Sequence, residues 1–143
     1  MATRANADLK NTLIKRYAVK NTSVITAGSR VRFGATDIEV DATSGANDDT
    51  CFGTALEGGT GNAGGTVLID VALDGHQIVA MTVGTGGSTR GLKQVQAANG
   101  VTDAPANADG TVVHTSIGIA MQTGVAGDLI GVMPINARFV CAT

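Results

Sequence analysis

Aromatic side chains are scarce in this sequence. The 143 residues include no Trp, one Tyr and three Phe, so aromatics make up 3% of the chain. Hydrophobic residues still account for 43%, which predicts a core built mainly of Val, Ile, Leu and Ala. Stacking of nucleic-acid bases requires aromatic rings on a basic surface. The composition therefore argues against specific nucleic-acid binding.

Residues that bind metals or act as nucleophiles are also few. The cysteines, Cys51 and Cys141, and the histidines, His76 and His114, have neither zinc-site spacing nor a disulfide framework. We read the cysteines as small, reduced core residues. No Gly-x-Ser-x-Gly motif, signal peptide or apolar run of about 18 residues occurs. We expect no enzymatic activity, catalytic residue, metal, cofactor or membrane insertion.

Glycine is abundant, at 20 of 143 residues, which is about twice the usual share. A glycine-rich segment at 50–73 recurs at 116–135. Both copies read apolar-Gly-x-Ala-(Leu/Met)-(Glu/Gln), then a turn containing Ala-Gly, then an apolar run. Glycine allows the positive φ of tight turns, and the apolar run is typical of a strand. Each copy therefore predicts a β-hairpin.

The two copies can be aligned residue by residue. Gly53 and Ala55 match Gly118 and Ala120 at an offset of 65. After the turn, the Ala-Gly at 63–64 matches the Ala-Gly at 126–127 at an offset of 63. The alignment predicts that the turn of the first copy is two residues longer. Nothing in the repeat carries reactive chemistry, so we interpret it as an architectural unit.

Weaker matches extend the repeat toward the N-terminus. Gly28 matches Gly91 at an offset of 63, and Asp41-Ala42 matches Asp103-Ala104 at an offset of 62. These matches predict a tandem duplication with halves at about 24–73 and 86–135. We expect an all-β fold in which two similar hairpin-containing halves form one compact β-sandwich or β-barrel over residues 24–143.

The N-terminal segment has a different charge from the rest of the chain. Residues 1–35 carry seven bases and one acid, whereas residues 36–143 carry three bases and eleven acids. We interpret residues 1–23 as a basic N-terminal arm on an acidic body. Leu9, Leu13 and Tyr17 recur every four residues, so the arm is either a short amphipathic helix or an extended segment that orders on a partner.

The glycine-rich segment 84–91 resembles a loop that cradles phosphate. It lacks the Lys-(Ser/Thr) of a P-loop, and no helix pattern follows it. It is also faintly similar to the C-terminal motif of trimeric dUTP pyrophosphatases, but the other motifs of that family have no match here. We interpret the segment as a turn between the halves.

Three segments together resemble the small capsid decoration (cement) proteins of tailed bacteriophages. They run Val-Gly-Thr-Gly-Gly-Ser-Thr-Arg-Gly at 83–91, Asn-Gly-Val-Thr-Asp-Ala at 99–104, and Ile-Gly-Ile-Ala-Met followed by Gly-Val-Ala-Gly-Asp at 117–128. The resemblance covers roughly residues 24–135, and the long basic N-terminal segment departs from it.

This resemblance implies a non-enzymatic virion protein on the outer surface of an icosahedral phage head, assembled in the host cytoplasm. The implied partner is the major capsid protein, and the implied form is a homotrimer that cements neighbouring capsomers. Within the arm we expect the capsid-binding residues to be Arg4, Lys10, Lys15, Arg16 and Tyr17. Alternatives are a head-fibre base, a tail-tube protein, a trimeric nucleotide-binding enzyme and a basic arm that binds nucleic acid non-specifically.

Overall fold

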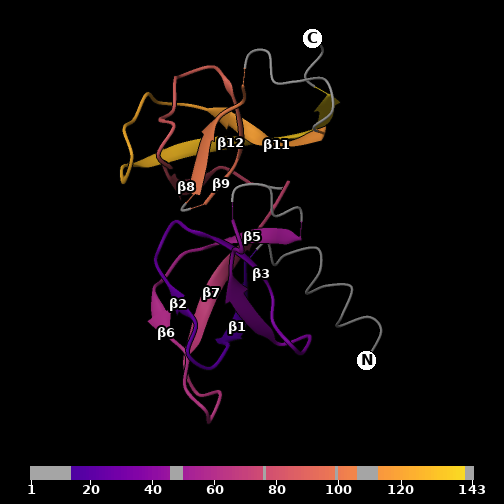
Figure 1. Cartoon of the computed structure of the whole chain (residues 1–143), viewed down its shortest axis with the longest axis vertical. Helices are drawn as coiled ribbons and strands as arrows, with labels where there is room; N and C mark the ends of the chain where they lie inside the picture. The colour runs from indigo at the N-terminus through magenta and orange to yellow at the C-terminus, as the bar shows by residue number, and fades with distance from the viewer. Residues whose placement is uncertain (1–13, 46–49, 76, 99, 106–112, 141–143) are drawn as a thin grey trace.

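The computed structural model describes residues 14–45, 50–75, 77–98, 100–105 and 113–140, and the side chains of 113–115 and 136–140 lie outside this description. The described residues form strands and no helix, which confirms the all-β prediction. The strands fall into two groups along the chain, which we call the first half and the second half (Figure 1).

The first half is a closed barrel. Its strands follow the order β1-β4-β3-β5-β7 and β7 pairs back onto β1, while β2 and β6 form a small separate ribbon. The strand bounds are β1 Ile14–Val19, β2 Val24–Ile25, β3 Arg30–Phe33, β4 Glu39–Ala42, β5 Cys51–Ala55, β6 Gly59–Thr60 and β7 Leu68–Leu73. Short β-prone segments separated by glycine turns account for this pattern.

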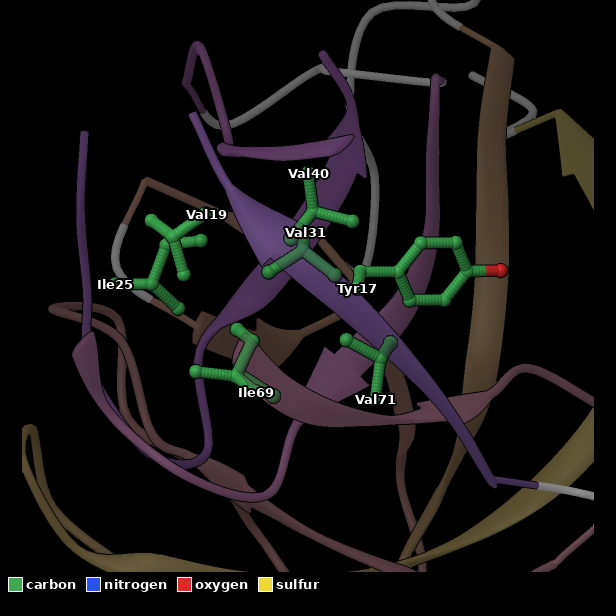
Figure 2. Packing of buried hydrophobic residues seen from close by; sticks show 8 residues of the cluster. Tyr17, Val19, Ile25, Val31, Val40, Ile69 and Val71 are labelled. Carbon is green, nitrogen blue, oxygen red and sulfur yellow. The ribbon is translucent and has the colours of Figure 1, made fainter. Parts of the chain in front are cut away.

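Alternate residues of these strands fill the barrel interior with aliphatic side chains. Val31, Val40 and Val71 are fully buried, and Figure 2 shows them turned toward a common interior together with Val19 and Ile69. The two-residue period of a strand explains why Val19, Ile69 and Val71 share this face with Tyr17. The core is therefore built mainly of branched aliphatic residues, as the composition predicts.

The second half is a five-stranded sheet in the order β10-β9-β11-β12-β8. Its strand bounds are β8 Val79–Thr82, β9 Lys93–Ala97, β10 Gly100–Asp103, β11 Val113–Ala120 and β12 Leu129–Val140. A parallel bridge between Val83 and Val101 brings the two edge strands of this sheet together. The second half has its own buried cluster, which includes Ile130 and Val132.

The two halves share one strand topology. In both, a parallel contact joins the first and third long strands, as between Val19 and Val40 or Val83 and Val101. Several backbone hydrogen bonds of the two halves also correspond. The amide of Gly28 donates to the Ala55 carbonyl at 2.7 Å, and the amide of Gly91 donates to the Ala120 carbonyl at 2.8 Å. We call residues that make the same pairs in the two halves counterparts.

The two predicted hairpins are present, but with a different alignment. Ala55 pairs with Val71, and its counterpart Ala120 pairs with Val132, so the first pair is 16 residues apart and the second 12. The loop of the first hairpin is four residues longer, not two, and matching the Ala-Gly turns was wrong. The structural match aligns Leu-Ile-x-Val at 68–71 with Leu-Ile-x-Val at 129–132. Register is set by strand faces, whereas turn length is free to vary.

The predicted arm over 1–23 is too long. Residues 14–19 form β1, which pairs with β7 on one side and β4 on the other and so closes the barrel. The counterpart of β1 is β8, so the repeat also begins earlier than predicted. Residues 14–19 are a strand, so this part of the predicted arm is not an amphipathic helix. Residues 1–13 lie outside the described residues.

Candidate docking surfaces

The basic residues of the N-terminal region are largely paired within the fold. Arg16 contacts Asp70 at 2.8 Å, Lys20 contacts Asp41 at 2.7 Å, and the remaining pairs are Arg30 with Asp74 and Arg32 with Asp41. The charge asymmetry of the sequence is therefore mostly neutralised between neighbouring strands of the barrel. Arg4 and Lys10 lie outside the described residues, and Lys15 is half-buried in β1.

These contacts change the acidity of the carboxyl groups. Burial alone would raise the pKa of Asp41, but hydrogen bonds from Lys20 and Ser23 outweigh it and hold the pKa below its usual value. The hydrogen bond from Arg16 lowers the pKa of Asp70. Both carboxylates are thus stabilised in their charged form by side chains of the same half.

Tyr17 is a core residue, which corrects its prediction as a capsid-binding residue. Its side chain is 9% exposed. Its ring meets Phe33 and Phe52 edge to face at centroid distances of 6.0 and 5.5 Å. The burial raises the pKa of its phenol. The alternation along β1 decides the outcome, because Tyr17 and Val19 point inward while Arg16 points outward.

The glycine-rich segment 84–91 uses its own amides inside the fold. The amide of Ser88 donates to the Gly124 carbonyl, that of Thr89 to the Asp103 carboxylate, and that of Gly91 to the Ala120 carbonyl. A phosphate could accept these amides only by displacing bonds that hold the second half together. The segment is therefore a turn, but it lies inside the second half between β8 and β9, so its predicted place between the halves was wrong.

Arg30 lies at the junction between the two halves. Its side chain is 2% exposed, and its guanidinium donates to both carboxylate oxygens of Asp74 and to the Thr54 hydroxyl at 3.0 Å. Its Nε also donates to the Gln96 side chain in the second half at 3.1 Å. Arg30 therefore connects β3 and β5 of the barrel to Asp74, which directly follows β7, and to Gln96 in β9 of the second half.

Two more contacts complete the junction. The Thr82 amide donates to the Gly28 carbonyl at 2.8 Å, and a Cβ on Gly28 would collide with the Leu129 side chain. Gly28 also has φ +82°, a conformation that favours glycine. Ala72, on the outer side of β7, packs into the buried cluster of the second half. One side of the first half, at Gly28, Arg30 and Ala72, is thus covered by the second half.

Large apolar side chains remain exposed at several places, and two groups of them occupy positions that correspond to the junction in the other half. On the second half, Leu92 and Met133 are 48% and 42% exposed next to half-buried Ile119, and we call these three residues the second-half face. On the first half, Phe33 of β3 and Leu68 of β7 are 51% and 50% exposed, and we call these two residues, on separate strands, the first-half mouth. Exposed apolar groups of this kind mark sites of protein association.

Neither surface is predicted by the sequence patterns described above. The repeat does hold one signal for exposed apolar positions, because Leu68 and Leu129 are identical in the corrected alignment and both are exposed. Among the described residues, no three His, Cys, Asp or Glu side chains group together, and no helix is long and apolar enough to cross a membrane.

The fold is similar to that of a known phage protein. A solved structure described as the head fiber gp8.5 N base in bacteriophage phi29 matches this chain with a TM-score of 0.61 and 12% sequence identity. The match covers 88% of this chain and 98% of that chain. No protein-family model matches the sequence, and no curated protein matches it. At this identity the likeness establishes a shared fold.

Proposed function

We propose that this chain is a structural protein of a tailed-phage virion that docks on the outer surface of the head. The observation that carries the proposal is the fold match over nearly the whole of both chains, since the matched protein is described as a head fiber base. The segments at 83–91, 99–104 and 117–128, which resemble capsid decoration proteins, support the same location. The protein acts by attachment and not as an enzyme.

The proposed partner is the major capsid protein. A homotrimer would present several copies of each docking surface, so modest contacts would add up to tight attachment. Held across neighbouring capsomers, such a trimer would cement them together. We keep Arg4, Lys10, Lys15 and Arg16 as the proposed capsid-binding residues; of these, Arg16 would have to exchange its contact with Asp70 for one with the capsid.

The test is co-sedimentation of the purified protein with expanded, undecorated heads. We expect saturable binding at a fixed ratio of protein to capsid subunits, and absence of binding would refute the proposal. Deletion must stop at residue 13, because removing residue 14 onward destroys β1 and opens the barrel. Arg4→Gln with Lys10→Gln tests the basic segment, and Val125→Gln, at an exposed turn, is the control.

A head-fibre base is the second candidate, and the matched structure specifically favours it. The two roles differ in what binding does to the head. A cementing protein raises the temperature at which heads release DNA, because it joins capsomers. A fibre base binds heads at similar occupancy without changing that temperature. Measuring DNA release from decorated and undecorated heads separates the two.

A further inference from the structure

The junction between the halves uses one side of the first half and one end of the second. The first half contributes Gly28, Arg30 and Ala72, and the second half contributes Gln96 and Leu129. Because the halves share one topology, each of these residues has a counterpart in the other half. Among the described residues, the junction contacts given above do not include Gly91, Met133, Phe33 or Leu68, so the chain carries the same pair of surfaces a second time.

The second-half face is the counterpart of the side that the junction buries. Ala72 is 1% exposed, whereas its counterpart Met133 is 42% exposed. Gly91 is the counterpart of Gly28 and has nearly the same φ, +85° against +82°. A Cβ on Gly28 would collide with Leu129, but a Cβ on Gly91 would meet no atom within 4 Å. This side of the second half is therefore formed but uncovered.

The first-half mouth is the counterpart of the end that covers the junction. Phe33 corresponds to Gln96, which contacts Arg30. Leu68 corresponds to Leu129, whose side chain lies beside Gly28 and is itself 57% exposed, so Phe33 is the main anchor of the first-half mouth. Phe33 stacks on Phe52 with centroids 4.0 Å apart and planes 11° apart, so its ring is held in place with one face covered. A fixed aromatic ring and a flexible Met side chain make a favourable contact.

We propose that copies of this chain bind each other head to tail, with the first-half mouth of one copy on the second-half face of the next. The contact repeats, between copies, the junction that joins the halves within one copy. Phe33 of one copy then packs against Met133 and Ile119 of its neighbour. Such a contact is heterologous, so it builds a ring if the rotation closes and a filament if it does not.

One bond of the junction does not recur between copies. The Thr82 amide donates to the Gly28 carbonyl, but the amide of its counterpart Ala18 already donates to the Ile38 carbonyl at 2.9 Å. The contact between copies therefore depends on apolar side chains, and we expect it to be weaker than the junction and reversible. This inference does not rest on head binding, and its main test uses the purified protein alone.

The test is sedimentation velocity of the full chain and of two variants over a range of concentrations. Phe33→Gln places the residue type of its counterpart at the mouth, and Met133→Asp places a charge on the face. We expect each to weaken self-association by at least about tenfold, as loss of an interface anchor does. Val24→Gln and Val125→Asp, at sites 62% and 70% exposed, are the matched controls and should associate like wild type.

Mixing the two variants gives the sharper result. Phe33→Gln keeps an intact face and Met133→Asp keeps an intact mouth, so a head-to-tail contact predicts a dimer in the mixture that neither variant forms alone. A dimer in the mixture also shows that both variants are folded, because each must then contribute an intact surface. A mixture that stays monomeric overturns the proposal. A monomeric wild type, or variants that associate normally, overturns it as well. If wild type is monomeric and Met133→Asp loses head binding, the face belongs to the capsid instead.

Discussion

Replacing Asp74 with Ala should destabilise the fold more than a surface position of this kind would suggest. The carboxylate is 33% exposed, but its partner Arg30 is 2% exposed. Removal leaves a buried guanidinium with only the neutral acceptors of Thr54 and Gln96. Breaking a buried ion pair by removing one partner costs about 3–5 kcal/mol, and the partial exposure of Asp74 places this case near 3 kcal/mol.

Chemical denaturation of three variants measures this effect. Asp74→Ala should lower the unfolding midpoint strongly, and Arg30→Met with Asp74→Leu should recover most of the loss, because no buried charge is then left without a partner. Asp70→Ala is the matched control, since it breaks an ion pair with Arg16 that lies in solvent. Equal midpoints for Asp74→Ala and Asp70→Ala, or a double variant as unstable as Asp74→Ala, would refute the reasoning.

Three further outcomes follow from packing and charge. Gly118→Ala should lower the free energy of unfolding by roughly 1–3 kcal/mol, because the new Cβ collides with the Met133 carbonyl, whereas Gly64→Ala, which has room, should change little. Ser88→Ala should be neutral or slightly stabilising by denaturant titration, since its buried hydroxyl has no hydrogen-bond partner among the described residues; a clear loss would contradict this. The lowered pKa of Asp41 stabilises the fold above the unfolded-state pKa of about 3.9, and this stabilisation disappears as the pH falls through the lower folded-state pKa. Asp41→Asn should therefore flatten the fall in thermal stability under acid, and an unchanged acid profile would contradict it.

Local pattern was enough to predict most strands that follow residue 23, and both hairpins, but not β1. The segment 37–41 alternates polar and apolar residues and becomes β4 at Glu39–Ala42. The Gly of the Asn-Gly pair at 99–100 is the first residue of β10. Glycines at turns were the residues from which the repeat was recognised. Gly28 and Gly91 occupy equivalent positions in the two halves, as predicted. Asp103 does not match Asp41, because backbone pairing makes it the counterpart of Ala42, one position further on.

Some equivalent positions carry different residue types in the two halves, and there the sequence pattern does not predict burial. Gln94 is 0% exposed at the position where the first half has Val31, and its side chain donates to the Asp103 carboxylate at 2.7 Å. From the sequence alone, a polar residue in a strand predicts a position that faces solvent. Only the partner strand supplies the carboxylate that makes burial tolerable.

The sequence by itself determined the all-β class, the hairpin units and the duplication, because each depends on residue periodicity and on glycine at turns. The tertiary structure alone decided that residues 14–19 close a barrel, that the N-terminal bases pair with acids of neighbouring strands, and that one side of the first half is buried while its counterpart is open. These depend on which strands meet, and strands distant in sequence meet only when the barrel closes.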